Sequence, residues 1–308
     1  MSGPKSLSDA ELQKLTEVGR GVELNTTSGP DFLAVDALHE LLQVVGYLKY
    51  LRGSGAVMLR GQTSLYSTLD PSLYRGLKVN RTNRDSIIGG FIQTTSPWSC
   101  THADHAPVLC TEKVPQLPSS RRGLLASGTP RYAAEGLLQH YGIRTRWLDF
   151  VDNVWVALWF ACHDFVRAGR FVHVVRRVPV TGSEYAYLVG VVVDGPLVEK
   201  APGLFRSEGE AHLLDLRRAV PSFYLRPHAQ HGWLLRPWMN DPRNFTTINI
   251  RVDLGVALNW LGSGQLLSAF GMYPPASVDV GYRTLLQNVD TMNIPEVLGS
   301  IDVAGPGY

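Results

Sequence analysis

The sequence predicts an α+β protein, with helices early in the chain and a mostly antiparallel sheet afterwards. Two observations predict this class. Apolar residues recur at helical spacing in the first half of the chain, as in "AVDALHELLQVVGYLKYLRG" at residues 34–53. After about residue 170 the pattern changes to short β-branched runs such as "RFVHVVRRV" and "TTINIRV", which Gly, Pro and Asp separate.

Composition narrows the class of protein further. The chain has 308 residues, 44% of them hydrophobic and 18% charged, which is enough for one large domain or two small ones with a core. A formal net charge of +2 is too small to indicate nucleic-acid or membrane binding by bulk electrostatics. The polar start and the absence of an apolar run of roughly 18 residues predict no membrane segment. With three cysteines and no paired spacing, we expect a reduced, cytoplasmic protein.

Helix signals come in order along the chain. We expect helices over residues 7–19, 34–53, 130–142, 151–169, 254–263 and 277–290. Pro130 and Gly142 mark the ends of the third, because proline favours the first turn and glycine follows the last. The fourth begins at a cap from Asp152 or Asn153 and is expected to stop at Gly169.

Strand signals concentrate in the second half. One short buried strand, "AVMLRGQ", ends near Gly61. Further strands are expected at residues 170–178, 185–194, 222–227, 232–237 and 246–252.

The domain organisation follows from these elements. We expect an N-terminal helical segment at 1–34, a main domain at 35–250 and a C-terminal extension at 251–308 that packs on the domain. Residues 79–130 lack periodicity and are read as a loop-rich insertion. Within it, residues 95–122 are expected to form an exposed loop or a disordered insertion.

Several ordered motifs resemble the FRG domain, a bacterial family. They are Leu59-Arg60-Gly61-Gln62; Leu69, Pro71-Ser72-Leu73 and Arg75; Gln139-His140-Tyr141-Gly142 with Thr145, Arg146, Leu148 and Asp149; Ala157-Leu158 with Phe160-Ala161; and Gln230 with Gly232. The resemblance covers roughly residues 35–235. This sequence departs from the family pattern at Leu59, Arg144, Trp147 and Phe150, where the family has Phe, Pro, Leu and Trp.

The order of elements is also similar to that of ADP-ribosyltransferases. This resemblance implies a split sheet around a cleft, NAD as the substrate and no metal. It further implies a nucleic-acid or protein target, and a bacterial toxin or defence effector with an antitoxin or immunity partner. It departs from that family where a catalytic Glu strand is expected, because "HAQHGWLL" brings Gln230 there instead. An NAD-hydrolysing enzyme and a noncatalytic nucleotide- or nucleic-acid-sensing module remain alternatives.

The same motifs supply the candidate cofactor-binding residues. They are Arg60, Gly61, Gln62, Arg75, Tyr141, Thr145 and Arg146. An arginine at the end of an apolar strand suits a pyrophosphate, since the guanidinium contacts it in bidentate fashion and the following glycine lets backbone approach a ligand. The competing interpretation is a structural arginine bonded to a loop carbonyl. Asp149 is read as the partner of one arginine or as a helix cap.

His140 and Gln230 are the candidate catalytic residues. Histidine works as an acid or base near neutral pH, although a histidine at a helix C-terminus also interacts favourably with the helix dipole. Gln230 could hydrogen-bond a ribose but carries no charge, so the general base is the weak point of this interpretation. Glu208 and Glu210 are read as helix-capping residues. The run "CTHADHAPVLC" has metal-ligand spacing without a second half-site, so we expect no metal.

Overall fold

The structure is a computed structural model that describes residues 32–304 and short pieces before them. Those pieces are residues 5–6, 8, 10, 13–14 and 23–25, and the gaps after residue 32 are 53–54, 67–68, 76–80, 96–124, 126–128, 170, 181, 183, 194, 208–210, 237–245 and 290–292. Most of the helix predicted at 7–19 and almost all of the segment 95–122 lie outside the described residues. So do Glu208, Glu210 and the run "CTHADHAPVLC".

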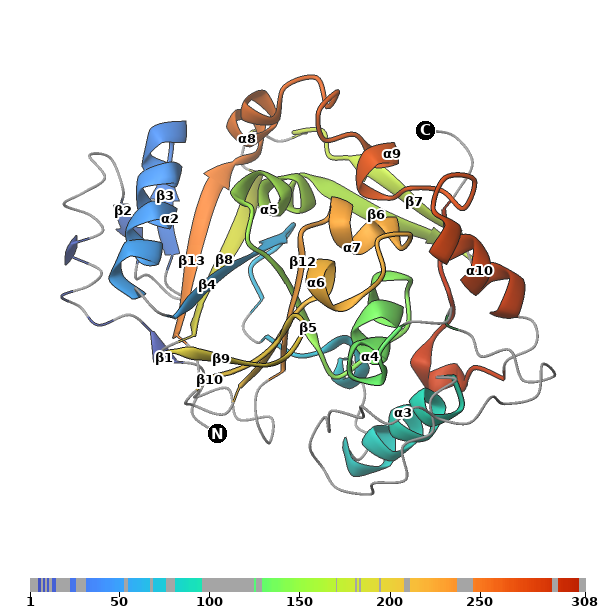
Figure 1. Cartoon of the computed structure of the whole chain (residues 1–308). Helices are drawn as coiled ribbons and strands as arrows, with labels where there is room; N and C mark the ends of the chain where they lie inside the picture. The colour runs from blue at the N-terminus through green and yellow to red at the C-terminus, as the bar shows by residue number, and fades with distance from the viewer. Residues whose placement is uncertain are drawn as a thin grey trace.

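One large mixed sheet organises the chain (Figure 1). Its first half consists of β2 (Glu23–Asn25), β3 (Phe32–Val35), β13 (Thr246–Asp253), β8 (Tyr185–Val193) and β4 (Ala56–Gln62), in that order. Its second half consists of β5 (Leu148–Val151), β12 (Gly232–Arg236), β11 (His212–Asp215), β10 (Leu204–Ser207) and β9 (Leu197–Ala201). The described pairings within this sheet are antiparallel except those of β13 with β3 and with β1 (Lys5–Ser6). The predicted α+β class is confirmed.

The two halves of the sheet meet at a single pair of residues. Leu59 of β4 pairs with Val151 of β5, and the ladder between these two strands extends no further. Beyond Leu59, β4 continues its pairing with β8 as far as Gln62. On the other side, β5 stays paired with β12 from Leu148 to Val151. The strands therefore diverge and open a wedge in the sheet.

Helices cover the two halves separately. α2 (Leu38–Arg52), α5 (Val154–Ala161) and α8 (Leu254–Leu261) share one buried apolar cluster with β4, β8 and β13. α4 (Arg131–His140), α6 (Leu216–Ala219) and α10 (Val280–Val289) belong to a second cluster. α7 (Leu225–Ala229) packs beside these three helices. A third cluster contains Met58, Phe150, Val191 and Leu235 and so joins both halves of the sheet.

Smaller elements complete the fold. α3 (Arg81–Thr95) and the 3-10 turn η1 (Ser72–Tyr74) pack beside α4, while α9 (Ala269–Met272) lies beside α7. The 3-10 turn η4 (Glu296–Leu298) precedes the last strand. A second, three-stranded sheet has the order β14 (Val303–Ala304), β7 (Phe171–Arg176), β6 (His163–Ala168).

Several predicted elements were wrong in type or extent. The helix expected over 151–169 ends at Ala161, because residues 163–168 pair with β7 and Gly169, at φ +62°, is the turn of that hairpin. The strand expected at residues 222–227 does not form, and residues 225–229 are the helix α7, with Pro227 in its first turn, where its missing N–H costs nothing. Part of the expected loop-rich insertion is the helix α3. Strands β9, β10 and β11 were not predicted; they form a run of antiparallel pairs next to β12, and this pairing is not visible in the local sequence pattern.

Candidate functional site

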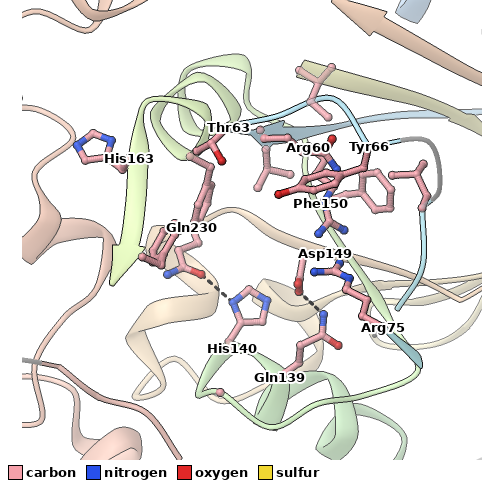
Figure 2. A pocket seen from close by; sticks show the side chains of 18 of the residues that line it. Arg60, Thr63, Tyr66, Arg75, Gln139, His140, Asp149, Phe150, His163 and Gln230 are labelled. Carbon is pink, nitrogen blue, oxygen red and sulfur yellow. Dashed lines mark hydrogen bonds between the residues drawn. The ribbon is translucent and has the colours of Figure 1, made fainter. Parts of the chain in front are cut away.

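A cavity of about 640 Å³ fills the wedge between β4 and β5 (Figure 2). Its volume lies in the range typical of small-molecule sites. Residues from both halves of the sheet and from the C-terminal region line it: Leu59, Arg60, Gly61, Gln62, Thr63, Tyr66, Leu69, Asp70, Tyr74, Arg75, Gln139, His140, Gly142, Asp149, Phe150, Val151, Phe160, His163, Phe165, Gln230, Tyr273 and Asp302. Six of the nine predicted site residues are among them; Tyr141, Thr145 and Arg146 are not.

One side of the cavity is cationic. Burial and the nearby charge of Arg75 lower the pKa of Arg60 to about 10, although Asp149 and Tyr66 oppose the shift. Within the described part of the chain, the Arg60 guanidinium makes no ion pair and no hydrogen bond. Arg75 donates from Nε to the backbone oxygen of Asp70 at 2.9 Å. Figure 2 shows the two guanidinium groups close together above Asp149. A desolvated cation beside a second cation favours an anionic ligand.

Gln62 and Gly61 extend this side of the cavity. The Oε1 atom of Gln62 is buried and has no hydrogen-bond partner among the described residues, so it can accept a bond from a ligand at no cost to the protein. Gly61 lines the cavity, but a Cβ atom at this position would lie 1.9 Å from the backbone oxygen of Ala157. Its missing side chain therefore makes room for α5, whatever its role toward a ligand.

A hydrogen-bond network explains the run from Gln139 to Asp149. Gln139 donates from Nε2 to a carboxylate oxygen of Asp149 and accepts at Oε1 from the hydroxyl of Thr145. The backbone N–H of Thr145 donates in turn to the hydroxyl of Ser72 at 3.1 Å. These bonds tie the 3-10 turn, the end of α4 and the start of β5 together. Thr145 is fully buried and supports the cavity from behind, rather than lining it.

Arg146 and Tyr141 also point away from the cavity. Arg146 makes a buried, bidentate contact with Glu135, with Nη2–Oε2 at 2.5 Å and Nε–Oε1 at 3.1 Å. The Tyr141 hydroxyl donates to Asp279 at 2.8 Å, and the tyrosine is completely buried. Both side chains therefore bond partners within the protein, as residues with a structural role do. The cavity gives no support to the prediction that they contact a ligand, because neither lines it.

His140 and Gln230 lie together in the cavity wall, and their bonds fix the proton of the imidazole. A carbonyl oxygen only accepts, so the amide Nε2 of Gln230 must donate to the backbone oxygen of Met272 at 2.7 Å. Its Oε1 then faces Nδ1 of His140 at 2.9 Å, and Nδ1 must carry the proton. Nε2 of His140 is thereby unprotonated, and it is buried without a partner among the described residues. Burial lowers the pKa of His140 below its usual value, while Asp149 and Gln230 oppose the shift, so the ring is neutral near pH 7.

The backbone around Gln230 explains the Gln-x-Gly pattern. Gln230 caps α7, and His231 at φ 51° turns the chain into β12, in a left-handed conformation that is uncommon for a non-glycine residue. At Gly232 the absence of a Cβ leaves space for the His140 ring. A Cβ atom there would lie 2.7 Å from Cε1 and 2.9 Å from Nε2 of that ring.

Replacing Gly232 by alanine is therefore expected to displace the His140 ring into the cavity. The overpacking should cost about 1–3 kcal/mol of stability. Because burial is what lowers the pKa of His140, displacement should raise that pKa toward its ordinary value of about 6.5. Titration of the His140 ring by NMR, alongside denaturant unfolding, measures both effects. An unchanged titration curve in Gly232→Ala would contradict the tight fit of His140 against residue 232.

Aromatic rings form another side of the cavity. Phe160 of α5, Phe165 of β6 and Tyr273 after α9 line it, with ring centroids 5.9 Å apart for Phe160–Phe165 and 5.4 Å apart for Phe165–Tyr273. Phe165 is 41% exposed, which is unusual for a large apolar ring and places it where a ligand can cover it. Flat rings of this kind stack on planar ligands.

Sequence reasoning missed the contribution of the last 50 residues to the site. Tyr273, the backbone oxygen of Met272 and Asp302 all belong to the extension at 251–308. No spacing in the sequence marks them, because each reaches the cavity through long-range packing.

Among the described residues, no group of three or more His, Cys, Asp or Glu side chains could hold a metal ion. No helix in the described part is both long and apolar enough to cross a membrane.

The fold and this site define an α+β protein with a cavity at the split of its sheet. Comparison with known families identifies the segment that builds most of the cavity: residues 55–168 match the family model of the FRG domain. The chain therefore contains an FRG domain, as the motifs in the sequence predicted. That segment runs from the start of β4 to the end of β6, and it includes Arg60, His140 and Asp149 but not Gln230. No curated protein and no solved structure matches the chain.

Proposed function

We propose that this protein is an NAD-using enzyme of ADP-ribosyltransferase type. The observation that carries the proposal is the cavity at the split of the sheet, with desolvated Arg60 and neighbouring Arg75 on one side and aromatic rings on another. Such a cavity suits a ligand that combines phosphates with flat rings, and NAD is one. The order of an Arg-Gly strand, a central helix and a late Gln-x-Gly strand supports the same assignment as an analogy.

Each side of the cavity has a role in this proposal. Arg60 and Arg75 bind the pyrophosphate by charge-assisted hydrogen bonds. Phe160 and Tyr273 stack on a ring of the dinucleotide. Gln230, held by His140, Met272 and Tyr273, keeps one lone pair of Oε1 with which to accept a hydrogen bond from a ribose hydroxyl.

The positive charge that develops at the ribose carbon during transfer needs a nearby anion. No glutamate is among the described residues that line the cavity, and the amide of Gln230 is uncharged. Asp149 supplies a carboxylate there, and Gln139 fixes it in place by a hydrogen bond. Electrostatic stabilisation of this kind usually contributes more to catalysis than any other single effect. We therefore assign Asp149, rather than Gln230, to the oxocarbenium-like centre.

The acceptor of the ADP-ribosyl group is a nucleic acid or a protein in this proposal. A toxin or defence effector that modified either would need an antitoxin or immunity partner in the cell that makes it. The lack of a glutamate among the described cavity residues also favours a second candidate, a noncatalytic nucleotide-sensing module. Hydrolysis of NAD in the same cavity is a third outcome, in which water is the acceptor.

One experiment separates these functions. The purified protein is incubated with NAD labelled in its adenylate half, together with DNA, RNA or cell lysate, and both transferred label and free nicotinamide are measured. We expect label on a macromolecule together with nicotinamide release. Nicotinamide release without transfer would instead identify an NAD hydrolase. Binding of NAD without either product would identify the sensing module, and failure to bind NAD would exclude the proposal.

A further inference from the structure

The carboxyl group of Asp302 enters the same cavity from the far end of the chain. Asp302 lies just before β14, outside the segment that matches the FRG domain. Its backbone N–H donates to the carbonyl oxygen of Tyr141 at 2.7 Å, and its carbonyl oxygen accepts from the hydroxyl of Tyr282. Both neighbouring peptide groups are thus fixed, and the side chain has a defined position.

Gly142 provides the space for this carboxyl group. It adopts φ +107°, which favours glycine, and a Cβ atom at this position would lie 2.4 to 2.8 Å from three atoms of the Asp302 carboxyl group. The glycine that ends α4 therefore has two reasons to be there. One is the backbone turn, and the other is the approach of Asp302 to the cavity.

The charges around Asp302 make it a suitable acid or base. Burial raises the pKa of its carboxyl group, while the guanidinium groups of Arg167 and Arg226 oppose the shift. Arg167 approaches to 2.7 Å, with half of its own side chain exposed and the side chain of Asp302 largely buried. Arg226 is buried, with its guanidinium carbon 5.1 Å from the ring of Tyr273 and 4.3 Å from that of Tyr282. Arg167 and Arg226 are the charged groups that shift the pKa of Asp302, and Tyr273 is a titratable group whose pKa Asp302 raises in turn.

Asp302 differs in this respect from the other carboxylates of the cavity. Asp149 accepts from Gln139 and lies close enough to Arg60 to act on its charge, on the cationic side of the cavity. Asp70 belongs to the loop before the 3-10 turn, where Arg81 approaches it at 3.7 Å. Asp302 reaches the cavity from the C-terminal region, on the side of Tyr273, and its negative charge helps to raise the pKa of that tyrosine.

We propose that Asp302 is the general base that takes the proton from the acceptor during ADP-ribosyl transfer, an inference that rests on the proposed function. The acceptor's O–H or N–H group attacks the ribose carbon, and the bond from that carbon to nicotinamide breaks. Nicotinamide leaves as a neutral molecule with the electron pair of that bond. The acceptor's proton passes to the Asp302 carboxylate, which then releases it to solvent. The three residues share the chemistry: Asp149 stabilises the cationic centre, Gln230 positions the ribose and Asp302 removes the proton.

The test is Asp302→Asn, an isosteric change that removes the base. We expect NAD affinity to be unchanged and kcat to fall by about 100-fold or more, which is the usual contribution of a general base. Asp164→Asn, an exposed carboxyl group on β6, is the matched control and should retain its turnover. The acidic limb of the pH dependence of kcat should disappear in Asp302→Asn.

A second variant separates this role from a purely structural one. Arg167→Ala removes a charge that lowers the pKa of Asp302, so the acidic limb should move to higher pH with NAD binding intact. If the contact between Arg167 and Asp302 is only structural, both variants should have a lower melting temperature while the acidic limb of the pH dependence stays in place. That result would overturn the proposal. Full turnover in Asp302→Asn would also overturn the proposal for Asp302. The proposed function would still stand in that case, provided that the parent protein turns over NAD. A parent protein that does not bind NAD would exclude both.

Discussion

Gly61→Ala is expected to lower the free energy of unfolding by about 3 kcal/mol or more, the upper end of the usual cost of overpacking. The added Cβ would lie 1.9 Å from the backbone oxygen of Ala157 and 2.7 Å from the backbone nitrogen of Ala161. A side chain could rotate away from such a clash, but the backbone of a buried helix cannot. Relief therefore requires α5 to move off β4, at the point where the largest apolar cluster is packed.

Denaturant unfolding of Gly61→Ala measures this cost. Gly46→Ala is the matched control, because Gly46 lies inside α2 and a Cβ there has nothing within 4 Å. That change should stabilise the protein by up to about 1 kcal/mol through helix propensity. An unfolding midpoint of Gly61→Ala equal to that of the parent would show that α5 does not rest on residue 61.

Local patterns were sufficient to predict the elements that carry a strong period or an end signal. α2 and α4 lie where helical spacing and, for α4, Pro130 and Gly142 placed them. β4, β8 and β13 lie where β-branched runs placed them. The prediction failed where long-range pairing decides between two local possibilities. Residues 163–168 continue the helical spacing of α5, yet they become a strand because β7 lies beside them.

The candidate site, like the fold, was predicted from the sequence only in part. Arg60, Arg75, His140 and Gln230 line one cavity although three separate regions of the sequence supply them, as their motifs predicted. Thr145 and Arg146 belong to the same motif as His140, and yet their partners Gln139 and Glu135 turn them inward. A motif thus predicts that its residues act together, but only packing decides which of them face a ligand. Asp302 had no motif at all.

Arg60→Ala is expected to weaken binding of NAD and of ADP-ribose by roughly 10- to 150-fold, because one charge-assisted hydrogen bond contributes about 1.5–3 kcal/mol. Arg60→Lys should recover only part of this, since an ammonium group lacks the planar fork that matches a phosphate. The thermal stability of Arg60→Ala, in contrast to its affinity, should not fall. Within the described residues Arg60 makes no ion pair or hydrogen bond, and its removal relieves its burial and its repulsion with Arg75, which together outweigh the attraction to Asp149 and Tyr66.

The melting temperature of Arg60→Ala should therefore equal or exceed that of the parent, whereas a structural arginine would lower it. Arg283→Ala, an exposed arginine on α10, is the control and should change neither quantity. Calorimetric titration with NAD and thermal unfolding on the same samples give both numbers. A stable Arg60→Ala protein that binds NAD as tightly as the parent would remove the phosphate role from Arg60. A less stable variant with intact binding would instead assign Arg60 to the fold, because the guanidinium would then stabilise the divergence of β4 and β5 and not a ligand within it.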